Sequence, residues 1–148
     1  MRAHGYFYDF LREKSKTNQS LPPKIYLHAY AGNEDITKQL LKLNIDSDLY
    51  FGFSSSSNLR NEEKLAKVLK LISPSKLLLE SDGESVMDNK KTTDNDATAS
   101  VALDGSGSNV IERDLMKMRN FMCKTLEINM EDLCMLTANN AQAFFGTS

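Results

Sequence analysis

Side chains capable of chemistry follow three short apolar runs of the sequence. His28 stands near the end of the run 24–30, four consecutive serines (residues 54–57) follow the run 48–53, and Asp82 follows the run 77–81. Imidazole and carboxylate groups bind divalent metal ions, and a bound metal lowers the pKa of a water molecule until it is a nucleophile near neutral pH. A serine run can also hold a phosphate through hydroxyl and backbone N–H groups.

Each of these residues also has an ordinary structural interpretation. A single histidine in an apolar run is typically a hydrogen-bonded core residue, and an aspartate before a glycine typically caps a turn or a helix. The serines are equally typical of a flexible, solvated loop. Glu80 is either an inward polar group of its strand or a partner that orients a metal ligand, and the spacing alone leaves these alternatives open.

The elements around these residues alternate between strand and helix. Apolar runs that predict buried strands begin near residues 24, 48 and 76, and helices with one apolar face separate them, after a first helix over residues 4–16. Asn33 and Asn61 are expected to cap the two intervening helices. Such strands are parallel, so their carboxyl ends, with His28, the serines and Asp82, are expected to share one edge of the sheet.

The final part of the chain changes character. Residues 84–109 lack aromatic side chains and contain a polar stretch and a Gly-Ser-Gly-Ser run. This composition predicts a disordered, low-complexity insertion. Two helices are expected over residues 110–126 and 130–145, with methionines filling gaps in the core. Cys123 and Cys134 lack a CxxC spacing, which favours reduced thiols over a zinc site.

Length and composition exclude several classes of protein. The 148 residues, 41% hydrophobic and 26% charged, are typical of one globular domain, and a complete eight-unit α/β barrel of about 250 residues does not fit. A net charge of −2 gives no strong field for DNA, RNA or lipid, so any nucleic-acid binding must be local. No segment of the sequence has the pattern of a membrane-spanning helix or of a signal peptide, and we expect a cytoplasmic or nuclear protein.

Three segments resemble successive signatures of the TatD-type metal-dependent hydrolases, in the family's order and at nearly its spacing. They are Leu27-His28-Ala29-Tyr30-Ala31-Gly32, Leu77-Leu78-Leu79-Glu80-Ser81-Asp82, and residues 136–146. The resemblance implies that His28 is a metal ligand, that Asp82 is a metal ligand and the catalytic general base, and that Glu80 orients the site. It assigns a structural role to the last segment, through Thr137, Asn140 and Phe144.

The resemblance also implies a fold. It makes residues 1–148 the C-terminal part of a (β/α)8 TIM-type barrel, about the last three βα units, with residues 84–109 inserted within it. The family's H-x-H pair, its bridging glutamate and a further histidine are not present in the sequence. Glu84 stands where the family usually has a proline, and the insertion replaces the stretch on the substrate side.

These observations give two functional expectations. The first is a fragment or truncated member of a phosphodiester hydrolase that acts on DNA through two divalent ions (Mg²⁺, Mn²⁺ or Zn²⁺), with the isolated chain inactive because most ligands are missing. The second is a noncatalytic descendant that binds a protein partner, or itself, through exposed barrel edges. A flavodoxin-like domain also fits the strand and helix order, but the first strand lacks a Gly-rich phosphate loop.

Overall fold

The structure is a computed structural model that describes residues 3–17, 19–81 and 110–146 of the chain. The expected insertion over residues 84–109 and the candidate catalytic residue Asp82 lie outside the described residues. The described part comprises the sheet, the helices around it and the ends of the strands up to Ser81.

Three parallel strands form the centre of the described fold. β1 (Lys24–Leu27), β2 (Asp48–Phe53) and β3 (Leu77–Leu79) lie in the order β1-β2-β3, with β2 in the middle. Both strand pairs are parallel, and Tyr26 lies opposite Tyr50 across the first pair. The expected succession of parallel βα units is confirmed for this sheet.

Two strands are shorter than the sequence predicts. β1 was expected to reach Tyr30 but ends at Leu27, and Ala29 has a φ of 46°, in the left-handed region that extended backbone avoids. β3 was expected to continue toward Asp82 but ends at Leu79. His28 therefore lies in a turn rather than within a strand, where it is free to project from the edge of the sheet.

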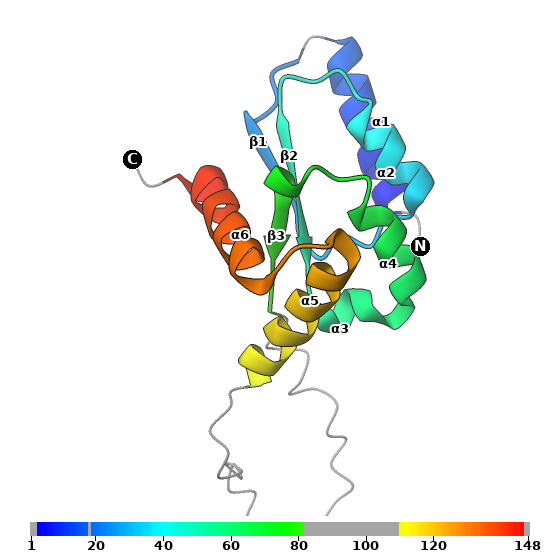
Figure 1. Cartoon of the computed structure of the whole chain (residues 1–148). Coiled ribbons are helices and arrows are strands. Elements are labelled where there is room, and N and C mark those ends of the chain that lie inside the picture. Colours follow the sequence, from blue (N-terminus) through cyan, green and yellow to red (C-terminus); the bar gives the residue numbers. More distant parts are fainter. Residues whose placement is uncertain (1–2, 18, 82–109, 147–148) are drawn as a thin grey trace, which may run out of the picture.

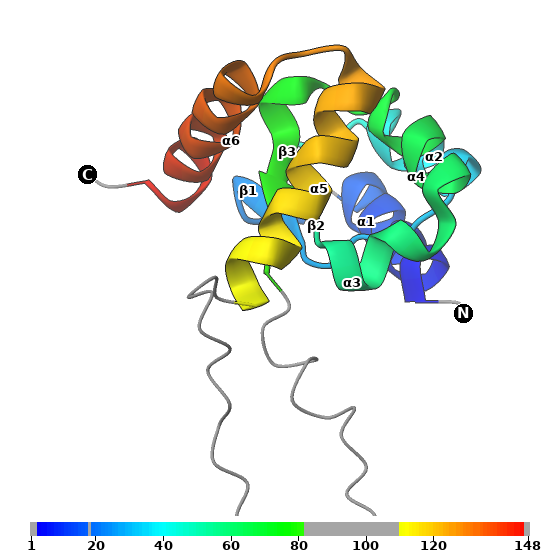
Figure 2. The ribbon, with the colours of Figure 1, turned by 60° about the horizontal axis from the view of Figure 1, so that its bottom comes forward.

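Helices cover both sides of the sheet (Figures 1 and 2). One side carries α1, α2 and α4, with α5 packed beside them, and α6 lies on the other side next to β3. The longer helices are α1 (Ala3–Lys16), α2 (Glu34–Leu41), α4 (Glu62–Leu69), α5 (Val110–Leu126) and α6 (Met130–Phe145); the short ones are α3 (Ser55–Asn58), η1 (Leu59–Asn61) and η2 (Pro74–Lys76). None of these helices in the described ranges is long and apolar enough to cross a membrane.

The expected caps form as the sequence indicates. The side chain of Asn33 accepts a hydrogen bond from the backbone N–H of Ile36 at 3.0 Å, and Asn61 does the same for Lys64 at 3.0 Å. These bonds satisfy backbone N–H groups that lack a partner in the first turn of a helix. They fix where α2 and α4 begin after the loops that leave the sheet.

One face of the sheet packs on the main hydrophobic core. Alternate residues of β2, namely Leu49, Phe51 and Phe53, point into it, and Met118 and Met122 of α5 fill it as the sequence predicts.

The apolar side of α2 is narrower than its sequence pattern predicts. Leu40 is buried, but Leu41 is 42% exposed and Leu43 follows the end of the helix.

The opposite face carries Tyr26, Gly52 and Glu80, and we call it the site face. Phe144 of α6 packs on this face, with its ring centroid 5.4 Å from that of Tyr26 and 5.2 Å from that of Tyr50. The ammonium group of Lys24 also donates to the backbone carbonyl of Ala143. The end of α6 thus covers part of the site face, at Tyr26 and Tyr50.

Asn140 holds α6 to the segment that leads into β3, consistent with the packing role that the sequence implied. Its side-chain amide donates to the carbonyl oxygens of Pro74 at 2.7 Å and Leu77 at 2.8 Å. We expect Asn140→Ala to lower the free energy of unfolding by about 2 kcal/mol, because the buried Leu77 carbonyl and the partly buried bond to Pro74 lose their donor. Urea denaturation measures this difference.

The neighbouring Asn139 provides the matched control, since its side chain is exposed on the same helix. Asn139→Ala is expected to change the stability by less than about 0.5 kcal/mol. Equal losses for the two variants would show that the bonds of Asn140 do not hold α6 in place.

Candidate functional site

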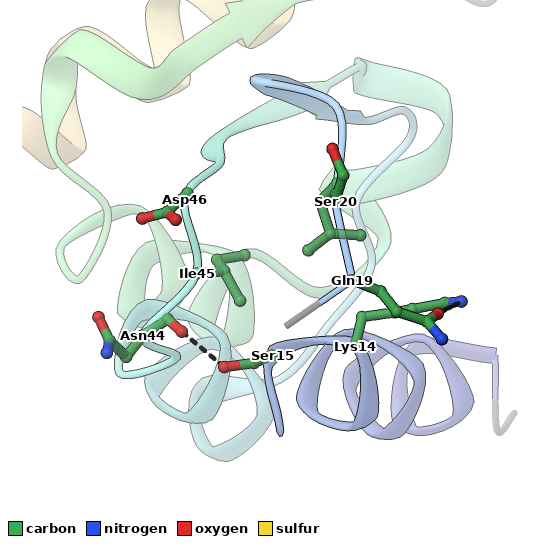
Figure 3. A pocket seen from close by; sticks show the side chains of 8 residues that line it. Lys14, Ser15, Gln19, Ser20, Asn44, Ile45 and Asp46 are labelled. Atoms are coloured by element: carbon green, nitrogen blue, oxygen red, sulfur yellow. Dashed lines mark hydrogen bonds between the residues drawn. The ribbon is translucent and has the colours of Figure 1, made fainter. Parts of the chain in front are cut away.

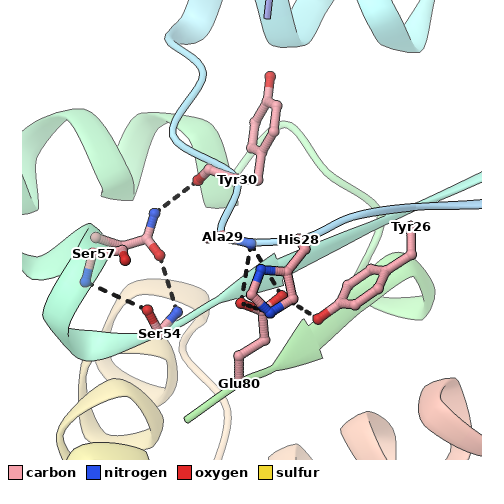
Figure 4. Close-up of polar contacts among 8 residues, drawn as sticks. Tyr26, His28, Ala29, Tyr30, Ser54, Ser57 and Glu80 are labelled. Carbon is pink, nitrogen blue, oxygen red and sulfur yellow. Dashed lines mark hydrogen bonds and ion pairs between the residues drawn. The ribbon is translucent and has the colours of Figure 1, made fainter. Parts of the chain in front are cut away.

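Two ionisable side chains meet at the carboxyl ends of the outer strands. His28 follows β1 and Glu80 follows β3, and His28 Nε2 lies 3.5 Å from Glu80 Oε2 (Figure 4). Because β2 separates the two outer strands, the glutamate side chain reaches across the middle strand to meet the histidine. Residues 52 positions apart in the chain thus form one polar cluster.

Glu80 is the buried centre of this cluster. The residue is only 7% exposed, and its carboxylate accepts several hydrogen bonds. The Tyr26 hydroxyl donates to Oε1, and the backbone N–H of Ala29 lies 3.2 Å from Oε1 and 3.0 Å from Oε2. A buried carboxylate needs such donors, because it has lost its contact with water. The bonds also fix the left-handed turn at Ala29 against β3.

Gly52 makes room for this crossing. A Cβ atom at position 52 would overlap the carboxylate of Glu80 and crowd the hydroxyl of Tyr26. A side chain on the middle strand is therefore incompatible with the path of Glu80 across the site face. Glycine is required here for the close approach and not for an unusual backbone angle, since its φ is not positive.

His28 is the exposed member of the cluster. Its side chain is 67% exposed, and its ring meets the Tyr26 ring edge-on at a centroid distance of 5.7 Å. The core-histidine interpretation is therefore wrong. An imidazole that presents Nε2 to a carboxylate leaves Nδ1 available, and histidines that bind metals usually have this carboxylate partner. Glu80 thus lies where an orienting neighbour of a metal ligand belongs.

The described residues do not form a complete metal centre. Among them, no group of three or more His, Cys, Asp or Glu side chains is placed to hold one ion. Asp82, the other expected ligand, lies outside the described ranges, two residues beyond Glu80. His28 with Glu80 fits one ligand and its orienting partner, and the described part alone does not account for metal-dependent hydrolysis.

The serine run is ordered, unlike the flexible loop that the sequence suggested. Ser54 caps the short helix α3, and its backbone N–H donates to Asn58 Oδ1 at 2.9 Å. Ser54 is fully buried and Ser55 nearly so, and the Ser55 hydroxyl donates to Asp114 of α5. The solvated-loop interpretation is wrong for Ser54 and Ser55, because both are buried and hydrogen-bonded; Ser57 is exposed.

Three residues of this region were not identified from the sequence: Tyr26, Gly52 and Asn58. Asn58 joins the turn after β1 to the turn after β2, since its amide donates to the Tyr30 carbonyl at 2.7 Å. Strand alternation was the available signal for Tyr26 and Gly52, because both lie on the face opposite the apolar core residues. No spacing rule pointed to Asn58.

A wider hollow of about 590 Å³ lies elsewhere (Figure 3). It is lined by Lys14, Ser15 and Gln19 from the region of α1, and by Asn44 and Asp46 from the loop before β2. These loops enter the amino ends of the strands. Active sites of parallel α/β folds lie at the other end, so this hollow is not the candidate site.

Comparison with known proteins gives one result of consequence. A search of the curated proteins found no match. The family model described as TatD related DNase matches residues 1–146, nearly the whole sequence, and the matched range contains both His28 and Glu80. The chain therefore belongs to the TatD-related DNase family of hydrolases.

Proposed function

We propose that the chain is the C-terminal part of a TatD-type (β/α)8 barrel, and that it contributes His28 and Asp82 to a metal centre for phosphodiester hydrolysis. The observation that carries the proposal is the contact between the His28 imidazole and the buried Glu80 carboxylate at the carboxyl edge of the sheet. The family match supports DNA as the substrate. The metal would be Mg²⁺, Mn²⁺ or Zn²⁺, with two ions in the complete enzyme.

Each residue has a defined part in this proposal. Glu80 faces Nε2 and orients the exposed His28 ring, which leaves Nδ1 to bind an ion. Asp82 supplies the second ligand and the general base. Bound divalent ions polarise the phosphoryl group and activate water. The remaining ligands must come from groups outside the described residues, so we expect the isolated chain to be inactive or nearly so.

Incubation of the pure chain with labelled DNA and Mg²⁺, Mn²⁺ or Zn²⁺ tests the expected inactivity. No metal-dependent cleavage is expected, because two ligands do not fix a catalytic ion with useful affinity or geometry. The His28→Gln variant controls for a contaminating nuclease, since its preparation carries the same contaminants. Turnover by the wild-type chain that His28→Gln abolishes would overturn the expected inactivity and assign the activity to this chain.

Metal binding by His28 can be measured without activity. The chain has only two histidines, so His4→Gln leaves a single imidazole to observe by NMR. Substoichiometric Mn²⁺ is expected to broaden the His28 ring signals of this variant before it broadens other resonances. Broadening that begins at scattered surface carboxylates and spares His28 would contradict the metal assignment.

A second candidate function is partner binding without catalysis. It is favoured by the exposed apolar side chains of α6, because Phe145 is 70% and Met135 is 55% exposed. In the described part of the chain, β1 also pairs on one edge only. Size-exclusion chromatography at several concentrations discriminates, since a monomer at every concentration would count against self-association.

The proposed compartment is the cytoplasm or the nucleus. Cys123 and Cys134 are free thiols, which are typical of reducing compartments. Burial raises the pKa of the Cys123 thiol, which makes it less reactive as a nucleophile.

A further inference from the structure

We propose that a cavity lined by the turn after β1 binds a phosphate group of a DNA strand through Arg60 and Lys64. The cavity has a volume of about 250 Å³ and lies between the turn after β1 and the segment from α3 to α4. We call it the basic cavity. This inference deepens the proposed function, on which it rests, by naming residues that would hold the substrate.

The charges around the basic cavity favour an anion. Its lining includes Arg60 and Lys64 and contains no Asp or Glu. In the described ranges, neither of these two cations forms an ion pair with a carboxylate. Since the chain as a whole carries a net charge of −2, a pair of cations that no described carboxylate neutralises marks a local site rather than a general attraction for DNA.

The acidic side chains of an adjoining hollow are paired with other lysines. This hollow shares Asn61 and Lys64 with the basic cavity and also includes Glu34 and Glu63. Glu34 pairs with Lys38 at 2.6 Å, and Glu63 pairs with Lys67 at 2.8 Å. These bonds partly neutralise the two carboxylates, so they do not cancel the positive charge of the basic cavity.

The lining provides suitable donors for a phosphate. Lys64 Nζ donates to the Ala31 carbonyl at 2.7 Å, which fixes the ammonium group at the cavity wall and leaves two of its N–H bonds for a ligand. Arg60 is exposed and offers the planar donor pair that suits phosphate oxygens. The volume is below the range of about 300–1,000 Å³ typical of drug-sized ligands and suits one sugar-phosphate unit.

The floor of the basic cavity is apolar. Phe53, Leu65 and Val68 contribute to it, and all three are buried. A deoxyribose ring has apolar C–H edges that can rest on such a surface, while its phosphate meets the cations at the rim. An apolar floor beneath a positively charged rim fits a sugar-phosphate unit better than it fits a hydrated free ion.

One short turn connects the basic cavity to the candidate metal site. Ala29 is bonded to Glu80, Tyr30 donates its N–H to the Gly52 carbonyl at 2.9 Å, and Ala31 is bonded to Lys64. Each residue of the turn is therefore fixed to the sheet or to α4. Figure 4 shows that the Tyr30 ring leaves the turn on the side away from Glu80, toward the cavity that it helps to line.

The distance suits a continuous strand. Gly32 lies four residues beyond His28, so their Cα atoms are separated by at most about 14 Å. At about 3.4 Å per nucleotide, this corresponds to no more than about four steps along one strand. The separation of the two sites is therefore within the span of a short stretch of one strand.

Fluorescence anisotropy with a fluorescein-labelled ten-nucleotide oligothymidylate tests the proposal. The full chain is used in EDTA at low salt, so that neither metal nor turnover is needed. Arg60→Gln is expected to weaken binding about tenfold, because one charge-assisted bond is lost. The slope of log K against the logarithm of the salt concentration should also become less steep by about 0.7.

Lys70→Gln is the matched control. Lys70 is an exposed cation at the end of α4 that does not line the cavity, so its loss should change the affinity less than twofold. Lys64→Gln should weaken binding as Arg60→Gln does, provided that its thermal unfolding is unchanged. Equal effects of Arg60→Gln and Lys70→Gln, or no binding by the wild-type chain, would overturn the inference.

Competition with inorganic phosphate identifies the source of the phosphate group. We expect phosphate to displace the oligonucleotide only at concentrations far above the affinity for the strand, because a free ion lacks the sugar contacts. If phosphate displaced the oligonucleotide at concentrations similar to the dissociation constant of the strand, the site would bind free phosphate. This result would overturn the assignment to DNA. Since the assay contains no metal, its failure would leave the proposed metal site of His28 untouched.

Discussion

Gly52→Ala is expected to lower the free energy of unfolding by about 3 kcal/mol, one of the largest effects that a single methyl group can have in this protein. The added Cβ atom would occupy the space of the Glu80 carboxylate, which accepts bonds from the Tyr26 hydroxyl and the Ala29 N–H. Either the middle strand moves, or Glu80 gives up these hydrogen bonds. Urea denaturation measures the loss as a lower midpoint at an unchanged slope.

Gly5→Ala is the control for this substitution. A Cβ atom at Gly5 meets nothing within 4 Å, and the residue lies in α1. Alanine favours helix by about 0.5 to 1 kcal/mol over glycine, so this variant should be as stable as the wild type or more stable. A destabilised Gly5→Ala, or an unaffected Gly52→Ala, would contradict the account of the crossing glutamate.

Glu80→Ala is expected to cost about 3 to 4 kcal/mol. It removes the buried carboxylate that accepts bonds from the Tyr26 hydroxyl and the Ala29 N–H, so both part-buried donors lose this acceptor. It also removes the group that faces His28 Nε2. Urea denaturation gives the stability, and the NMR signals of the His28 ring report its mobility, which should increase.

Two other substitutions separate the causes. Glu80→Gln keeps one side-chain oxygen as an acceptor, so it should cost less than Glu80→Ala. Glu63→Ala removes a glutamate from an exposed ion pair with Lys67, and should change the stability by less than about 0.5 kcal/mol. Similar losses for Glu80→Ala and Glu63→Ala would mean that the burial and hydrogen bonds of Glu80 do not increase its contribution to stability.

The sequence predicts the parts of the fold that depend on periodic burial. Short apolar runs and helical spacing predicted three parallel strands, and the asparagines at positions 33 and 61 marked the starts of α2 and α4. Strand ends were predicted less well. The run that ends at Tyr30 is continuously apolar, but the Ala29 N–H bonds to Glu80 instead of continuing the ladder. A side chain from a distant strand thus ends β1 early, and no local pattern records it.

The candidate site was also only partly predictable, because some of its contacts join residues that are far apart in the chain. His28 and Glu80 were identified by residue type and by resemblance, and the structure brings them together. The role of Gly52 depends on a crossing between β1 and β3 that exists only after the strands have paired. The order of the serine run depends on Asp114, more than fifty residues later in the chain. Asp82 stays a prediction.

The late position of α6 in the chain has a consequence for synthesis on the ribosome. The three strands are complete once Leu79 has been made, whereas the aromatic ring that covers Tyr26 and Tyr50 belongs to Phe144. At about 5 to 20 residues per second, translation of the intervening stretch takes roughly 3 to 13 s. During this interval the rings of Tyr26 and Tyr50 lack the cover of Phe144, so this face of the nascent sheet has apolar surface still to bury.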